Sequence, residues 1–369
     1  MRRGLLRATA LIVLLLLCLT ACSSGTVVME YGKTTVTANM YQYWASAYKG
    51  VFSYSYADYV DNDSFWGMEL PGGGTVLAYL DSLVLDNVKR TMVCSELYDK
   101  MGYRLADSVY EEIDGRLDRL EEDYAGGNRN SFNEILATYG VNRKILREIY
   151  VMEAKVDGLK KALFQAGGPL ELTDSGRKTY YEENYARVQL LLINDAYKYK
   201  VSEDGHYYYD ETTGTYITEA LTEAELAVKK AKITAVDAAL ADGGDFYELM
   251  EKYSETGDYY GDEEPYPNGY YLTPAMDFIP EVTVAAFEMA EGEVKKVETD
   301  DGTFYLLREK LDEKAWAEKE NADFFPDYDE TVKQAAYLDY LSPYLGDVTV
   351  EKELIAAYTL KNVTANYRY

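Results

Sequence analysis

The stretch "LADGGDFYELMEKYSETGD", residues 240–258, predicts the end of one helix and the start of another within a few residues. Gly243 and Gly244 interrupt a helical pattern, because glycine readily ends a helix. Asp245 follows, with Glu248 three residues later, and this spacing is typical of a capped helix N-terminus. We therefore expect two successive helices joined by a glycine turn.

On either side of these helices, compact apolar runs alternate with helical patterns. Upstream, "ARVQLLLI" at 186–193 is a short apolar run of strand type, and the next helix begins at the capping box Thr222–Glu225. Downstream come "NGYY" at 268–271, a helix that begins at Pro280 and a strand at 304–308. The expected order is strand, helix, helix, strand, helix, strand.

This order, together with the residues that carry it, resembles the parvulin-type prolyl isomerases. The stretch at 240–258 resembles the helix–helix segment of that family, and "NGYY" resembles the glycine-containing strand that follows it. "PEVTVAAFEMAEGEVKKVETDDGTFYLLREKL", residues 280–311, resembles the closing helix, the glycine turn Glu291–Val294 and the final strand. The resemblance implies an α+β fold for residues 186–311, in which helices flank a small, mostly antiparallel sheet.

The residues before this segment show helical periodicity. After a predicted hairpin in "VVMEYGKTTVT" (27–37), Thr37 is a candidate helix cap. A second helix is expected from Thr75, ending at Gly102, a third with Ile113, Leu117 and Leu120 on one face, and a fourth at the capping box Ser131–Glu134. The residues expected on the inward faces of the first two helices are Met40, Trp44, Ala47, Val51, Val76, Leu80, Leu83, Val84 and Val88.

The helical part is similar to PrsA-type and SurA-type extracytoplasmic foldases, and "LATYGVNRKILREIYVMEAKV" (136–156) carries much of the likeness. In those proteins a parvulin domain is inserted between the two parts of a helical domain that binds unfolded exported chains. The resemblance implies the following segments: a lipoprotein signal peptide (1–21), a lipidated N-terminus with a short strand (22–32), a helical chaperone N-domain (33–185), a parvulin-like domain (186–311) and a C-terminal helical segment that packs on the N-domain (312–369).

The first residues have the pattern of an export signal. Arg2, Arg3 and Arg7 precede the apolar run "ALIVLLLLCL", which is too short for a comfortable membrane span. The following Leu19–Cys22 is similar to a bacterial lipobox, in which the cysteine is acylated. We therefore expect Cys22 to be lipidated and the protein to be extracytoplasmic, anchored to the outer face of the cytoplasmic membrane. An ordinary secretory signal is the alternative.

Composition excludes several classes of function. With 37 Lys and Arg against 64 Asp and Glu, the net charge is −27, which disfavours nucleic acid as a partner. Apolar residues make up 47% of the chain, enough for packed cores. Once Cys18 and Cys22 are assigned to the signal and the lipid, only Cys94 remains, so no disulfide framework is expected and Cys94 is predicted to be a buried thiol. We expect no metal and no cofactor; a homodimer stays open.

The only histidine, His206, lies in "SEDGHYYYDETTGTYIT" (202–218), with a predicted turn at Thr213-Gly214. Parvulins run directly from their first strand towards the next helix, so we interpret this stretch as an inserted hairpin and His206 as an exposed loop residue. The 38 tyrosines of the chain supply apolar ring faces with a polar hydroxyl at the tip, which suits contacts with peptides of varied sequence. A compositional habit of the source organism explains them equally well.

Isomerisation of an X–Pro bond needs no nucleophile, metal or redox cofactor. Its barrier of about 18–20 kcal/mol is lowered by an apolar socket for the proline and a preorganised environment for the twisted amide. The parvulin resemblance places Gln189 and Tyr305 at the two positions where the family has histidines. It places Glu255 or Thr256 at the acidic or thiol position.

The proline pocket is carried over in the same way. Phe278 falls at the family's methionine position, with Met276 two residues earlier, and Val282 falls at the phenylalanine position. Tyr271 lies where an aromatic residue is usual, and Phe287 belongs to the same predicted pocket. Neither glutamine nor tyrosine carries charge near neutral pH, so the resemblance alone leaves isomerase activity undecided.

Three functions therefore stay open. The first is a membrane-anchored folding factor that binds unfolded exported polypeptides and isomerises X–Pro bonds. The second is a holdase whose parvulin domain has lost activity. The third, from another class, is a surface lipoprotein that binds a small ligand or a glycan through its tyrosines, for which the sequence lacks the usual alternation of strands and helices.

Overall fold

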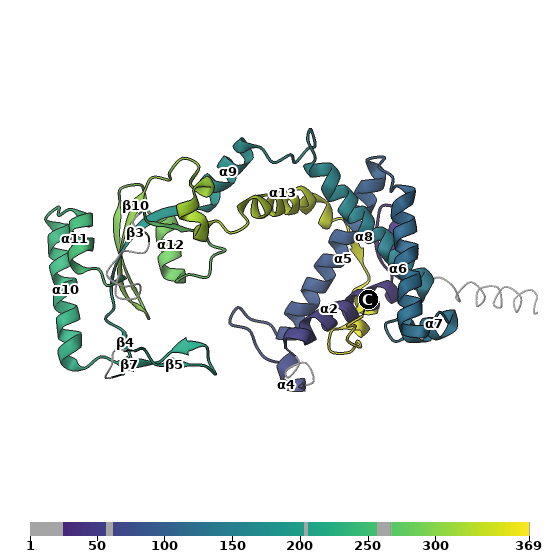
Figure 1. Ribbon diagram of the computed structural model, residues 1–369, viewed down its shortest axis with the longest axis horizontal. Coiled ribbons are helices and arrows are strands. Elements are labelled where there is room, and N and C mark those ends of the chain that lie inside the picture. The colour runs from purple at the N-terminus through teal and green to yellow at the C-terminus, as the bar shows by residue number, and fades with distance from the viewer. Residues whose placement is uncertain (1–24, 57–61, 203–205, 257–265, 267, 369) are drawn as a thin grey trace, which may run out of the picture. The chain divides into compact units, whose positions relative to one another are not determined.

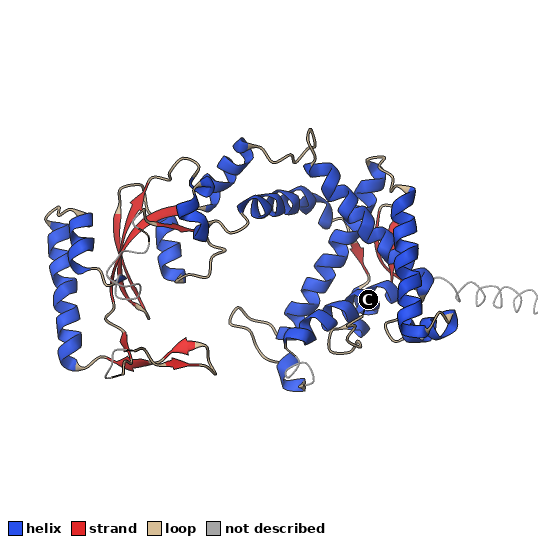
Figure 2. Ribbon diagram, viewed as in Figure 1, coloured by secondary structure: helices blue, strands red, loops and turns tan. Residues whose placement is uncertain are grey.

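The computed structural model describes residues 25–56, 62–202, 206–256, 266 and 268–368 (Figure 1). The chain divides into two compact units, one made of residues up to 171 together with 333–369 and the other of residues 172–332. Helices dominate the first unit, and the second contains a four-stranded antiparallel sheet flanked by helices (Figure 2). The predicted α+β class is confirmed.

The first unit combines the two ends of the chain. Its elements are β1 (Val27–Tyr31), β2 (Thr34–Thr37), α2 (Ala38–Ser55), α4 (Asp63–Trp66), α5 (Val76–Lys100), α6 (Asp107–Ala125), α7 (Arg129–Ala137), α8 (Arg143–Phe164), most of α13 (Tyr328–Leu345), β11 (Thr349–Val350), α14 (Lys352–Ile355) and η5 (Ala356–Tyr358). The sheet order is β11-β1-β2, with Met29 opposite Val350. The last strand of the chain therefore completes a sheet begun by the first hairpin.

Local sequence signals explain most helix starts in this unit. Thr37 and Thr75 cap α2 and α5, as predicted, each accepting a hydrogen bond from a backbone N–H one turn into the helix. The capping box expected at Ser131–Glu134 is wrong. Asn128 caps α7 instead, because its side chain accepts from the N–H groups of Asn130 and Ser131.

Two residues expected on inward helix faces are exposed. Val51 in the last turns of α2 is 74% exposed, and Leu83 in α5 is 38% exposed. Their neighbours on the same helices, Trp44 and Val88, lie in the core as predicted. Helical periodicity locates the apolar stripe, but how far along a helix the stripe is covered depends on the elements packed against it.

The second unit contains α9 (Asp174–Asn184), β3 (Ala186–Ile193), β4 (Tyr197–Tyr199), β5 (Tyr209–Asp210), β6 (Thr215–Tyr216), β7 (Thr218–Ala220), α10 (Glu223–Ala241), α11 (Phe246–Tyr253), β8 (Tyr270–Leu272), α12 (Pro280–Glu288), β9 (Val294–Thr299), β10 (Gly302–Glu309), η3 (Ala315–Ala317) and η4 (Lys319–Phe324). The main sheet has the order β8-β3-β10-β9. Strand β9 is an element that the sequence did not predict, because "VKKVET" is a polar edge strand with little apolar alternation.

The central strand β3 is covered on both faces. Val188, Leu190 and Leu192 belong to a core that includes α12, whereas Leu191 and Ile193 pack with α10 and α11. The two groups of helices lie on opposite sides of the sheet (Figure 1). A strand buried on both faces needs no polar alternation, which is why residues 190–193 of β3 are continuously apolar.

The second unit is larger than the predicted segment 186–311. Tyr181 and Tyr185 of the α9 region and Phe324, Phe325 and Tyr328 of the later segment join the same core as β3. These rings pack edge to face or tilted, for example Tyr185 and Phe325 at 4.9 Å between centroids. The aromatic side chains therefore extend the unit to residues 172 and 332.

Candidate functional site

A tyrosine-rich insertion separates β3 from α10. Strand β4 pairs with β7, and β5 pairs with β6 around a turn in which Gly214 has a φ of +71°. This conformation favours glycine, as the predicted Thr213-Gly214 turn requires. The inserted hairpin predicted for this stretch is confirmed, and His206 within it is exposed.

A buried carboxylate holds the base of the insertion in place. Glu255 is 5% exposed and accepts hydrogen bonds from Lys229 Nζ and Lys232 Nζ of α10, each at 2.6 Å. It also accepts from the backbone N–H of Asn194, where the insertion begins, at 2.9 Å. Burial raises the pKa of Glu255, but the two lysines and the N–H outweigh burial and hold this pKa below its ordinary value.

An uncharged cavity of about 490 Å³ lies between the insertion and the sheet. Strands β3, β8 and β10 provide its aliphatic and aromatic floor, the segment just before α12 provides one side, and the insertion provides three tyrosines. The lining residues are Leu190, Leu192, Tyr199, Tyr207, Tyr216, Thr256, Tyr270, Phe278, Ile279 and Phe304. The described lining contains no ionisable group other than tyrosine hydroxyls.

The three tyrosines of the insertion pack edge to face. Tyr199 lies 5.8 Å from Tyr207 and 6.0 Å from Tyr216 between ring centroids, with interplanar angles of 80° and 75°. This perpendicular geometry is favourable between rings and leaves ring faces available to another group. Tyr207 and Tyr216 are both about half exposed. The arrangement provides rigid apolar surfaces that a partner can cover.

The structure brings only Phe278 and Thr256 of the predicted residues to this cavity. Gln189 and Tyr305 are buried on the opposite face of the sheet, because successive residues of a strand point to opposite faces. The cavity is lined instead by Leu190 and Phe304, each one position away. A sequence alignment that is shifted by one residue transfers a site to the wrong face.

Tyr305 has structural partners on its own face. Its hydroxyl donates to Asp237 Oδ1 at 2.6 Å and lies 3.2 Å from the carbonyl oxygen of Ile233 in α10. Lys296 lies above its ring and binds the other oxygen of Asp237. Burial raises the pKa of Tyr305, and the nearby Asp237 raises it further, so the phenol stays protonated.

The remaining predicted pocket residues serve the core or the surface. Tyr271 is fully buried and donates its hydroxyl to Asp312 Oδ2 at 2.7 Å, while its neighbour Tyr270 lines the cavity. Val282 is also fully buried, and Met276 packs at the edge of the core. Phe287 on α12 is 38% exposed. Glu255 anchors the insertion from beside the cavity rather than lining it.

Other predicted groups lie away from this cavity. Cys94 is buried in the first unit, as predicted, and Tyr337 Oη lies 2.9 Å from its sulfur. Burial raises the pKa of Cys94 to about 11, so the thiol is not an activated nucleophile. Among the described residues, no group of three or more His, Cys, Asp or Glu side chains is placed to hold a metal ion. Cys22 lies outside the described residues.

Within the part of the chain that the structure describes, no helix combines the length and apolarity needed to cross a membrane.

Solved structures of PrsA foldases match most of the chain. Bacillus subtilis PrsA is 17% identical, with 80% of this chain and 93% of that chain covered and a TM-score of 0.22. The Bacillus cereus peptidylprolyl isomerase PrsA is 17% identical, with coverages of 78% and 91% and a TM-score of 0.29. The Lactococcus lactis foldase PrsA is 14% identical, with coverages of 92% and 99% and a TM-score of 0.19.

No protein-family model and no curated protein matches the chain. The solved structures belong to the group that the sequence resemblance named, but TM-scores this low carry no argument about function. We therefore infer the function from the residues and geometry of the chain itself.

Proposed function

We propose that this protein is a membrane-anchored extracytoplasmic folding factor that binds unfolded exported polypeptides. In this proposal the cavity beneath the tyrosine insertion takes up proline-containing and other apolar segments. The observation that carries it is the uncharged, aromatic lining of that cavity, with ring faces of Tyr207 and Tyr216 still exposed. Aromatic-lined grooves suit proline-rich segments, because the proline ring is apolar and the extended chain is already ordered.

Isomerisation of the bound proline is a second candidate function, favoured by the same lining. A twisted amide loses the resonance that separates charge in the planar form, so an uncharged cavity disfavours the planar ground state more than the transition state. No charged group is needed for this effect. The buried phenol of Tyr305 and the side chain of Gln189 lie on the other face of the sheet and are not assigned a role in it.

Peptide binding provides the direct test of the cavity. The protein from residue 23 onwards keeps every described residue and can be titrated into a fluorescent peptide that contains proline next to aromatic residues. We expect Tyr207→Ser and Tyr216→Ser each to weaken binding about five- to tenfold, since one well-packed aromatic contact contributes about 1 kcal/mol.

Tyr208→Ser is the matched control for these variants. Tyr208 is a neighbour in sequence and is similarly exposed, but its ring lies under Lys200 and does not line the cavity. Equal losses of affinity in the Tyr208 and Tyr207 variants would show that any exposed tyrosine of the insertion contributes to binding. That result would contradict the proposal that the peptide binds in the cavity.

Two assays decide between the functions. A protein that does not suppress aggregation of a denatured client at equimolar concentration is not a folding factor, and the ligand-binding alternative then stands. If aggregation is suppressed but proline-limited refolding proceeds at the rate in buffer, the protein is a holdase. Anchoring is tested separately by metabolic labelling with a radioactive fatty acid, which should label the wild-type chain and not the Cys22→Ser variant.

A further inference from the structure

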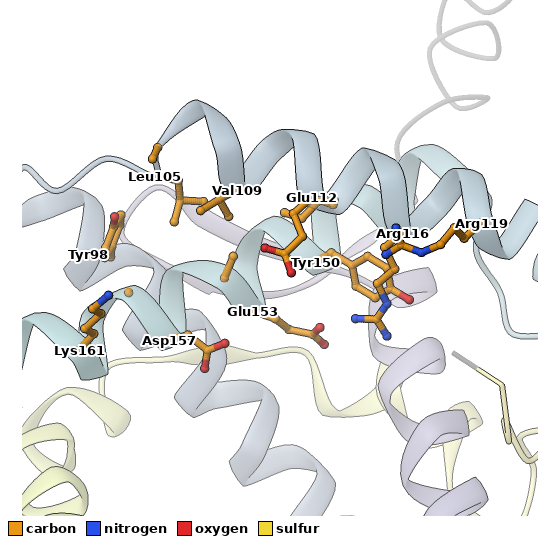
Figure 3. A pocket seen from close by; sticks show the side chains of 14 residues that line it. Tyr98, Leu105, Val109, Glu112, Arg116, Arg119, Tyr150, Glu153, Asp157 and Lys161 are labelled. Atoms are coloured by element: carbon orange, nitrogen blue, oxygen red, sulfur yellow. The ribbon is translucent and has the colours of Figure 1, made fainter.

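A second concave site lies in the helical unit, far in sequence from the tyrosine insertion. Helices α6 and α8 form its walls, and Tyr98 of α5 lies at one end (Figure 3). The groove has a volume of about 490 Å³. Its apolar surface comes from Leu105, Ala106, Val109, Ile113 and Ala154, and its charged lining comes from Glu112, Arg116, Arg119, Glu153, Asp157 and Lys161.

The central carboxylate of the groove is incompletely compensated. Trp44 Nε1 donates to Glu153 Oε1 at 3.2 Å, and this is the hydrogen bond that Glu153 receives from the described residues. Burial raises the pKa of Glu153, which the Trp44 hydrogen bond and the charge of Arg116 only partly oppose. A desolvated carboxylate with one neutral donor is costly, so a cation placed against it would be favourable.

The cation nearest to Glu153 is already engaged with a ring. The guanidinium of Arg116 lies 4.2 Å from the ring centroid of Tyr150, in cation–π geometry. Tyr150 is 4% exposed, and its hydroxyl forms no hydrogen bond of normal geometry within the described part of the chain, although Tyr43 is close enough to affect its pKa. Glu153, with one neutral donor, is thus the polar group of the groove whose hydrogen-bonding capacity is least met.

Two further carboxylates surround this point. Glu112 of α6 and Asp157 of α8, one turn after Glu153, line the groove, and the side chains of Glu112, Glu153 and Asp157 are all directed into it (Figure 3). Neither Glu112 nor Asp157 forms an ion pair within 4.0 Å to a described residue, in contrast to Asp114 on the outer side of α6, which pairs with Arg147. The lining cations Arg119 and Lys161 likewise form no ion pair within 4.0 Å to a described residue, so the place for an added cation is set by Glu153, which receives one neutral hydrogen bond.

We propose that this groove binds a lysine or arginine side chain of a bound polypeptide. The aliphatic stem lies on Val109 and Ile113, and the cation lies between Glu153, Glu112 and Asp157. Long basic side chains combine these two properties, because an apolar stem carries the charged head. The net charge of −27 further favours cationic segments over anionic ones.

This inference rests on the proposed function only in that the ligand is a polypeptide. The two sites are distinguishable, because a basic peptide without proline or aromatic residues offers nothing to the tyrosine cavity. The probe is a fluorescent peptide of lysine and aliphatic residues, titrated into the protein from residue 23 onwards at low ionic strength. The comparison peptides carry glutamate or norleucine in place of each lysine.

We expect the lysine peptide to bind at least tenfold more tightly than either comparison peptide. Glu153→Gln should weaken its binding at least fivefold, and Glu112→Gln at least twofold. The amide oxygen of a glutamine can still accept from Trp44, and Glu112 is exposed, so both variants should unfold at the wild-type temperature. Glu148→Gln on the outer face of α8 removes the same charge from the same helix and should leave binding unchanged.

Several outcomes overturn the proposal. One is equal weakening by Glu148→Gln, because it would show that only the net charge of the protein attracts the peptide. Another is tighter binding of the glutamate peptide, which would show that Arg116 and Arg119, and not the carboxylates, bind the ligand. A third is loss of lysine-peptide binding in the Tyr207→Ser variant with no loss in Glu153→Gln. Failure of proline peptides alone would instead contradict the proposed function and leave this groove standing.

Discussion

The two concave sites have nearly the same volume and opposite chemistry. The cavity beneath the insertion is lined by aliphatic and aromatic side chains, whereas the groove between α6 and α8 contains six charged residues. The first removes apolar surface from water, and the second offers carboxylates that lack full compensation. The volume of a site therefore does not define the class of ligand that it binds. The class depends on whether the polar groups of the lining have partners within the protein.

The largest effect is expected from a charge placed in the uncharged cavity. Phe278→Asp should weaken binding of a proline–aromatic peptide about 30-fold, roughly 2 kcal/mol, because the carboxylate would be desolvated by the peptide. Binding of the lysine peptide should be unchanged. Fluorescence anisotropy with both peptides measures the two sites in one preparation.

Val284→Asp is the matched control, since Val284 is exposed on α12 and does not line the cavity. A similar loss in this variant, or a parallel loss of lysine-peptide binding, would mean that the two sites are not independent.

A smaller effect, on the stability of the insertion, is expected when Glu255 loses its negative charge. The pKa of Glu255 is lowered in the folded protein, so its contacts with Lys229 and Lys232 contribute stability above the ordinary glutamate pKa, and this stability is lost as pH falls through the folded value. Glu255→Gln should lower the stability of the base of the insertion by about 2 kcal/mol at neutral pH, less than for a fully buried pair because the lysines are partly exposed.

Hydrogen exchange of the amides in β4 and β7 measures this effect. Protection factors, which are corrected for the intrinsic exchange rate at each pH, should fall in the wild-type protein on acidification towards and below the ordinary glutamate pKa. The Glu255→Gln variant should show low protection at all of these pH values. Equal protection in both proteins at neutral pH would show that the tyrosine contacts alone hold the insertion.

The smallest effect is expected on the face of the sheet opposite the cavity. Tyr305→Phe removes the hydrogen bond to Asp237 and should lower the free energy of unfolding by about 1 kcal/mol, without changing peptide binding or any isomerase rate. Urea unfolding and the peptide titration measure the two properties. A selective loss of isomerase rate would return Tyr305 to the catalytic role suggested by the family resemblance.

The limits of sequence inference are visible in β3 and β10. Strand character was evident from "ARVQLLLI", and the resemblance located the correct strands. The choice between Gln189 and Leu190, or between Tyr305 and Phe304, depended on which face of each strand meets the insertion. Since both faces of β3 are buried, polarity did not mark which face meets the insertion: Gln189 is as buried as Leu190.

The charged groove shows a different limit. Glu112 and Glu153 both belong to ordinary amphipathic helices, and nothing in their local sequence separates them from Glu111 or Glu148. Only the packing of α6 against α8, with Trp44 from α2 beneath, desolvates Glu153 and gathers the carboxylates in one groove. Burial and pairing are properties of neighbours that are distant in the chain.

The sequence by itself predicted many elements of this protein, though not the edge strand β9. The capped start of α11, the turn glycines, the two-sided strand β3 and the inserted tyrosine hairpin all follow from local preferences of backbone and side chain. Tertiary structure alone decided which residues line the two sites, because the face of a strand and the compensation of a charge depend on contacts between residues far apart in sequence.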